Sequence, residues 1–216
     1  MTRFCKPKQK IMKRISTTAI MLVAVALIST QCTDQKKEDT SATSEVKPAV
    51  AQFGGFESQV KWGEHLVTVS ACHDCHTPKK MTDRGPDIDS SLLLSGHPSQ
   101  MPIPDVDRKE LEGKGVTATS DLTSWIGAWG ISYTANLTSD ATGIGNWKED
   151  QFIYALRNGT MKGLAGSRPM LPPMPWQMYR NMTDDELKAI FAYLKTTKPI
   201  HNIVPQPTPP LSAKNK

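Results

Sequence analysis

Cysteine is scarce in this sequence, with four residues among 216. Cys72 and Cys75 lie three positions apart, whereas Cys5 and Cys32 lie in or beside the N-terminal segment. A structural zinc site would need a second pair of ligands at comparable spacing, and the remaining cysteines do not provide one. The chain also has no flavin, nicotinamide or copper motif, so the sequence predicts no redox chemistry based on these three cofactors.

Long apolar runs are equally scarce, and the run from Ala19 to Ile28 is too short for a comfortable membrane span. Six basic residues precede this run, so residues 1–31 are predicted to be an export signal. Ser29-Thr30-Gln31 then leads to Cys32, which resembles a bacterial lipoprotein signal with Cys32 as the lipidated residue. We therefore expect a periplasmic protein anchored to the membrane through Cys32. An ordinary cleaved signal and an uncleaved single anchor are the alternatives.

The positive charge of the chain comes from this leader. The whole sequence is formally +5, with 26 basic and 21 acidic residues and a pI near 9.0. The leader holds six of the basic residues and no acidic one, so 26 less 6 leaves 20 basic against 21 acidic residues, a formal charge of −1 from Cys32 onward. The sequence therefore predicts no nucleic-acid partner.

Composition divides the rest of the chain into three parts. Residues 32–55 are polar, show no apolar period and are expected to form a flexible tether. Residues 56–199 are predicted to form one domain. Residues 200–216 form a Pro-rich tail, for which we expect extended rather than folded backbone.

The central motif of the domain is Cys72-His73-Asp74-Cys75-His76. The C-x-x-C-H spacing is typical of c-type haem attachment, because two thiols on one helical turn can add to the two vinyl groups of one porphyrin. The histidine that follows lies beneath the ring and can bind the iron. A thiol-disulfide motif is the competing interpretation, but it would be expected at a helix N-terminus after a strand, whereas an amphipathic stretch precedes this one.

A second motif supplies a candidate for the opposite ligand. Arg168 to Trp176 contains three prolines within four residues, which favour a stiff extended segment. Met174 has proline on both sides, and its thioether is a soft ligand suited to haem iron. Met170, Met178 and Met182 are the alternatives, and core filling is the ordinary role of a lone methionine.

Helical patterns flank these motifs. One runs from about Val60 into the haem motif, with Gly63 as a point of close helix approach, and a second covers about Lys148 to Asn158. A third follows Thr183 and Glu186, which form a capping box. Residues 79–135 are expected to be loops and short pieces wrapping a cofactor. His97 in this region is interpreted as a loop histidine bonded to backbone or propionate, with iron ligation as the alternative.

Taken together, these features resemble the class I cytochrome c family. The resemblance rests on the haem motif, the loop methionine and the C-terminal helix from Asp185 to Leu194, and covers residues 56 to about 199. More narrowly, Asn136-Leu137-Thr138 and Leu171 to Trp176 are similar to exported cytochrome c domains associated with periplasmic dehydrogenases and respiratory chains. The resemblance implies an all-α cytochrome c fold, in which a few helices and long loops wrap one covalent haem c. It also implies that Arg168 and Trp176 belong to the haem environment.

The expected function is electron transfer rather than catalysis. With His76 and Met174 both bound, the iron would be six-coordinate and closed to substrates. The expected partners are redox proteins: a dehydrogenase, a quinol-oxidising complex or a terminal oxidase or reductase. If Met174 is not a ligand, a peroxidase-like haem enzyme or a gas sensor becomes the alternative. A fixed electron-transfer subunit of a dehydrogenase complex is a further alternative.

Overall fold

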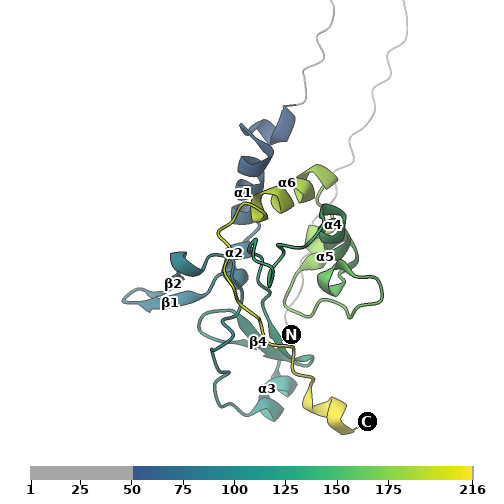
Figure 1. Cartoon of the computed structure of the whole chain (residues 1–216). Coiled ribbons are helices and arrows are strands. Elements are labelled where there is room, and N and C mark those ends of the chain that lie inside the picture. Colours follow the sequence, from purple (N-terminus) through teal and green to yellow (C-terminus); the bar gives the residue numbers. More distant parts are fainter. Residues whose placement is uncertain (1–50, 216) are drawn as a thin grey trace, which may run out of the picture. The chain divides into compact units, whose positions relative to one another are not determined.

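The computed structural model describes residues 51–215, so the predicted export signal, most of the tether and Cys32 lie outside the described residues. Six α-helices and five strands occur within this range (Figure 1). The helices are α1 (Gln59–Val69), α2 (Cys72–His76), α3 (Arg108–Lys114), α4 (Glu149–Asn158), α5 (Trp176–Tyr179) and α6 (Asp184–Leu194). The strands are β1 (Lys79–Thr82), β2 (Gly85–Ile88), β3 (Thr117–Ala118), β4 (Ser124–Gly127) and β5 (Gly130–Tyr133). None of the described helices has the length and apolar character needed to cross a membrane.

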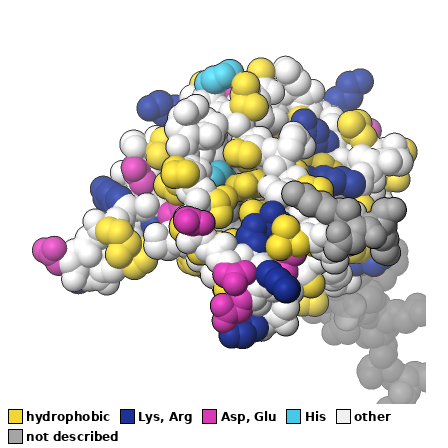
Figure 2. All heavy atoms as spheres, turned by 90° about the horizontal axis from the view of Figure 1, so that it is seen from below, with side chains coloured by type: hydrophobic (Ala, Val, Ile, Leu, Met, Phe, Trp, Pro, Cys, Tyr) yellow, Lys and Arg dark blue, Asp and Glu magenta, His cyan; other side chains and the backbone are white. Residues whose placement is uncertain are grey.

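The expectation of an all-α fold is wrong. Residues 79–135 contain two small antiparallel sheets, one of β1 and β2 and the other in the order β3-β4-β5. The β1–β2 hairpin projects to the left in Figure 1 and in Figure 2, and its strands are mostly exposed. The strands have two to four residues each, too few for an alternating pattern to be read from the sequence.

Helices α1 and α6 cross at Gly63, as the sequence predicts. A Cβ atom on Gly63 would lie 1.9 Å from the carbonyl oxygen of Ala189 and 2.8 Å from Cβ of Tyr193. Only glycine allows such an approach, because any side chain would overlap the backbone of α6. The crossing joins the two ends of the domain, and Leu66 and Val67 of α1 become part of its core.

The two later helices begin and end close to where the sequence places them. Helix α4 ends at Asn158, and the next residue, Gly159, has φ 62° and ψ 32°, the left-handed conformation typical of a helix C-cap. Helix α6 has the predicted capping box, since Thr183 and Glu186 each accept a hydrogen bond from the other's backbone N–H. Phe152 of α4 stacks on Phe191 of α6 with ring centroids 5.4 Å apart, so the two helices share one core.

Residues 200–210 are extended, as predicted for the tail, and pack against the domain, whereas Leu211–Asn215 form a short 3-10 helix. The side-chain amide of Asn136 donates to the carbonyl oxygen of Ile200 (2.9 Å), and Asn202 is buried. Further on, Thr208 pairs with Ile131 of β5. The chain from 200 to 210 therefore lies along the domain, and Figure 1 shows it in yellow beside the strands.

Candidate functional site

The C-x-x-C-H motif forms its own short helix. The sequence predicts one helix running into the motif, but α1 ends at Val69 and Ala71 takes a left-handed conformation (φ 58°) before α2 begins. The ammonium group of Lys79 donates to the carbonyl oxygens of His73 (3.2 Å), Thr77 (2.9 Å) and Asp74. A cation at the carboxyl end of a helix is favourable, so Lys79 stabilises the C-terminal end of α2.

His76 is fixed in the orientation that a metal ligand needs. Its Nδ1 lies 2.8 Å from the carbonyl oxygen of Ala135, which can only accept, so Nδ1 carries the proton and Nε2 keeps its lone pair. Burial lowers the pKa of His76, so the ring is neutral. A neutral imidazole with one free nitrogen is the form that binds a metal ion.

The two cysteines of the motif are not joined by a disulfide. Burial raises the pKa of Cys72 to about 11 and also raises that of Cys75. Thiols that exchange disulfides have lowered pKa values, so these shifts do not favour the redox-dithiol interpretation. Among residues 51–215, no group of three or more His, Cys, Asp or Glu side chains is placed to hold a metal ion.

These groups line one cavity of about 460 Å³. This volume lies in the range of small-molecule and cofactor sites. Cys72, Cys75, His76 and Met174 all contribute to its wall. The other wall residues come mainly from β4 and β5, from the loop before α4, from α4 and α6 and the chain between them, and from the tail, and include Trp125, Asn136, Ile144, Phe152, Ile190 and Val204. Two thiols, a neutral imidazole and thioethers around a largely apolar cavity fit a covalently attached haem.

Four methionines line the cavity: Met161, Met170, Met174 and Met182. The alternative Met178 does not, and it is 66% exposed. Met161 was not among the sequence candidates, because it lies in a short 3-10 turn (Met161–Gly163) with no proline frame. Met174 packs against the core cluster, and its N–H donates to the carbonyl oxygen of Leu171 (3.3 Å).

Ser132 connects the second sheet to the methionine segment, and sequence reasoning missed it. Its hydroxyl donates to the carbonyl oxygen of Pro172 (2.6 Å) and accepts from the indole N–H of Trp129 (3.1 Å). Ser132 and Pro172 are 40 positions apart, and a lone serine in a strand carries no sequence signal for such a contact. The sheet of residues 117–133 therefore supports the segment that presents Met174.

Replacing Ser132 by alanine is expected to destabilise the protein by about 1–3 kcal/mol, because the Pro172 carbonyl and the Trp129 indole both lose a partner. Urea unfolding followed by circular dichroism measures the change. Ser91→Ala is the control, since Ser91 is exposed and bonds only to nearby Asp89. Equal destabilisation by the two substitutions would contradict a role for Ser132 in holding the segment.

The remaining predicted residues occupy different places. Arg168 lines the cavity, and its guanidinium donates to the carbonyl oxygen of Pro169 (3.0 Å). Trp176 is not part of the cavity wall; its ring packs over Gly159, and Arg180 lies 5.7 Å from the ring centroid. Haem contact therefore stays a prediction for Arg168, and Trp176 supports the turn after α4.

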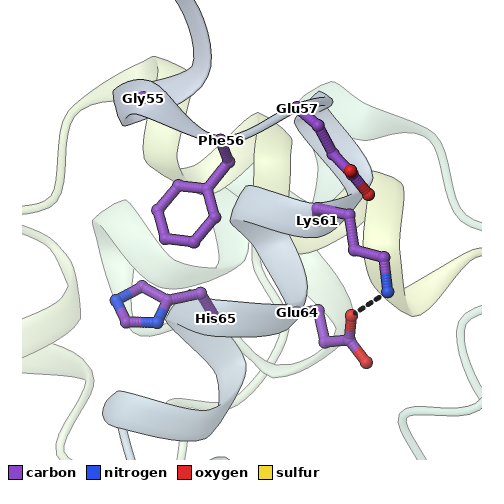
Figure 3. A pocket seen from close by; sticks show the side chains of 6 residues that line it. All are labelled: Gly55, Phe56, Glu57, Lys61, Glu64 and His65. Atoms are coloured by element: carbon purple, nitrogen blue, oxygen red, sulfur yellow. Dashed lines mark hydrogen bonds and ion pairs between the residues drawn. The ribbon is translucent and has the colours of Figure 1, made fainter.

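His97 is buried away from the cavity wall, with both ring nitrogens used within the protein. Nδ1 lies 2.7 Å from the hydroxyl of Thr123, and Nε2 lies 3.2 Å from the carbonyl oxygen of Met101. His65 lies in a separate open pocket, where it stacks on Phe56 at 4.8 Å beside the Lys61–Glu64 ion pair (Figure 3). Neither histidine is placed as a partner to His76.

Comparison with known proteins agrees with the geometry of the cavity. The family model described as Cytochrome c matches residues 60–198. The chain is 26% identical to the fructose dehydrogenase cytochrome subunit of Gluconobacter japonicus, over 86% of this chain and 29% of that protein. It is 26% identical to the gluconate 2-dehydrogenase cytochrome c subunit of Pantoea cypripedii, over 73% of this chain and 26% of that protein. It is 25% identical to the cytochrome c subunit of a quinone alcohol dehydrogenase of Gluconobacter oxydans, over 87% and 33%. The chain thus matches a third or less of the length of these relatives.

Proposed function

Because the chain belongs to the cytochrome c family, we propose that it transfers electrons through one covalently bound haem c and performs no substrate chemistry of its own. The observation that carries this proposal is the single cavity lined by Cys72, Cys75 and His76 together with methionine thioethers. The pocket beside His65 has no cysteine or methionine in its wall. The haem supplies, when bound, an iron that alternates between the ferric and ferrous states.

The protein's own residues do three things in this mechanism. Cys72 and Cys75 hold the cofactor in one orientation through their sulfur atoms. His76 would bind the haem iron through Nε2 while the Ala135 carbonyl holds its ring. We propose that Met174 would supply the second ligand to the iron, because the flanking prolines and the Ser132 bond to Pro172 restrict its segment. Two ligands that stay bound in both redox states would keep the reorganisation energy of electron transfer small. They would also leave no open coordination site on the iron for a substrate.

A dehydrogenase is the electron donor that the relatives favour. All three relatives described above are cytochrome subunits of sugar, sugar-acid or alcohol dehydrogenases. We infer that this chain accepts electrons from an enzyme of that kind and passes them to a further redox protein. The proposed compartment is the periplasm, with a lipid anchor on Cys32, as the leader sequence predicts.

Mass analysis of the mature protein, combined with a haem stain after denaturing electrophoresis, tests the cofactor and the processing together. We expect a mass that includes one haem, begins at Cys32 and includes lipid. The double variant Cys72→Ser, Cys75→Ser is the control and should lose the stain. A mass without haem would overturn the proposed cofactor, and a mature chain without lipid would overturn the anchor alone.

A redox titration followed by absorption spectroscopy tests electron transfer. One reversible one-electron transition is expected, together with a low-spin ferric spectrum. A high-spin ferric spectrum would contradict the six-coordinate iron and would favour the enzyme or sensor alternative.

A further inference from the structure

Part of the cavity wall comes from a segment outside the family match. The family model ends at residue 198, yet Ile203, Val204, Pro205, Gln206 and Pro207 line the same cavity as His76 and Met174. We call residues 203–207 the strap. The strap therefore lies outside the residues that the family model matches.

Asn202 anchors the strap at its upstream end. Its side-chain amide donates to the carbonyl oxygens of Ser95 (2.8 Å) and His97 (2.9 Å), and its side-chain oxygen accepts from the N–H of Ser99 (3.0 Å). Its own N–H donates to the hydroxyl of Thr142 (3.0 Å). Asn202 is only 8% exposed, so these bonds are shielded from water and fix where the strap begins.

Thr208 anchors the downstream end. Its N–H and carbonyl oxygen pair with Ile131 at 3.0 and 2.8 Å. The backbone passes so close to β5 that a Cβ atom on Gly130 would lie 2.1 Å from the Thr208 carbonyl oxygen. Beyond it, the N–H of Leu211 donates to the carboxylate of Glu112 (2.8 Å).

Between these anchors the strap is stiff and mostly apolar. Pro205 and Pro207 have no N–H and restrict φ, so the segment stays extended without hydrogen bonds of its own. Ile203, Val204 and the two prolines present apolar atoms to the cavity, and Ile203 is 67% exposed despite its place in the wall. An apolar segment held at both ends suits the covering of a flat hydrophobic ring.

We propose that the strap covers part of the haem and thereby sets the haem's exposure to water and its reduction potential. This proposal rests on the proposed function, since it requires haem in the cavity. Water stabilises the more highly charged ferric form, so excluding water from the haem raises the potential. Release of the strap is therefore expected to lower the potential without changing the axial ligands.

The full-length haem protein carrying Gly130→Ala tests the proposal by disturbing the downstream anchor. Gly85→Ala is the matched control, because Gly85 also has a positive φ (102°, against 93° for Gly130) but has no atom within 4 Å of its Cβ position. Hydrogen exchange at the Ile131 and Thr208 amides reports whether the anchor is lost, and spectroelectrochemistry reports the potential. We expect at least tenfold faster exchange and a lower potential in Gly130→Ala only. Faster exchange with an unchanged potential would overturn the proposal, and so would unchanged exchange.

A second pair of variants leaves both anchors in place. It tests whether the strap covers the haem even if Gly130→Ala does not fold. Val204→Asp puts a carboxylate in the strap, and Ser212→Asp puts one on an exposed residue beyond it. A negative charge beside the haem favours the ferric form, so a lower potential is expected for Val204→Asp and no change for Ser212→Asp. Equal potentials in the two variants would show that the strap does not lie against the haem. Loss of haem from the unaltered protein would instead overturn the proposed function, so the two failures are distinguishable.

Discussion

Replacing Met174 by alanine is expected to abolish the weak far-red absorption band of the ferric protein and to lower its reduction potential by roughly some tenths of a volt, within the ~0.8 V that axial ligands span. The physical reason is that a thioether stabilises ferrous iron more than the water or other ligand that would replace it. Absorption spectra and a redox titration of the variant give both quantities. The covalent attachment through Cys72 and Cys75 should be unaffected, so the haem stain should persist.

Met178→Ala is the matched control for this experiment, because Met178 is close in sequence and exposed but does not line the cavity. It should keep both the band and the potential. Met161, Met170 and Met182 line the cavity, and the same substitution in each tests whether one of them is the ligand instead. Retention of the band in Met174→Ala, with its loss in one of these three, would move the ligand assignment to that residue.

Gly63→Ala is expected to lower the free energy of unfolding by about 3 kcal/mol or more, because the new methyl group would overlap the Ala189 carbonyl at 1.9 Å and force α1 and α6 apart. The overlap is with backbone, which cannot move aside as a flexible side chain can. Urea unfolding followed by circular dichroism measures the loss. The crossing also positions the end of α1 that leads into the motif helix. The Gly63→Ala variant is therefore expected to lose its native haem spectrum at a lower urea concentration than the unaltered protein.

Gly113→Ala provides the matched control within a helix. Gly113 lies in α3 and its Cβ position has no neighbour within 4 Å, so alanine there should stabilise the protein by about 0.5 kcal/mol through its higher helix propensity. The two substitutions add the same methyl group and are expected to have opposite signs. A Gly63→Ala variant as stable as Gly113→Ala would show that the helices do not cross as closely as described.

Features formed by residues close together in the sequence were mostly predicted correctly, whereas most of those formed by distant residues were not. The Thr183–Glu186 capping box and the end of α4 at Asn158 depend on neighbours within one helical turn, and both predictions are confirmed. The expectation of loops in residues 79–135 missed the sheets, because β1 to β5 are short and their pairing depends on tertiary neighbours. The break in the helix at Ala71 was missed because the apolar pattern continues to the haem motif. Alanine also rarely adopts a left-handed backbone, so its presence does not predict one.

The sequence by itself determined that two thiols and an imidazole lie together, because Cys72, Cys75 and His76 fall within five consecutive residues and stay close wherever the chain places them. The tertiary structure decided what surrounds that helix. The Ala135 carbonyl that orients His76 is 59 positions away, and the Ser132 bond to Pro172 spans 40. Asn202 anchors the strap, and the residues that accept its side-chain hydrogen bonds, Ser95 and His97, lie 107 and 105 positions earlier in the chain. Contacts of this range form only when the whole domain packs, and no local pattern of residue types encodes them.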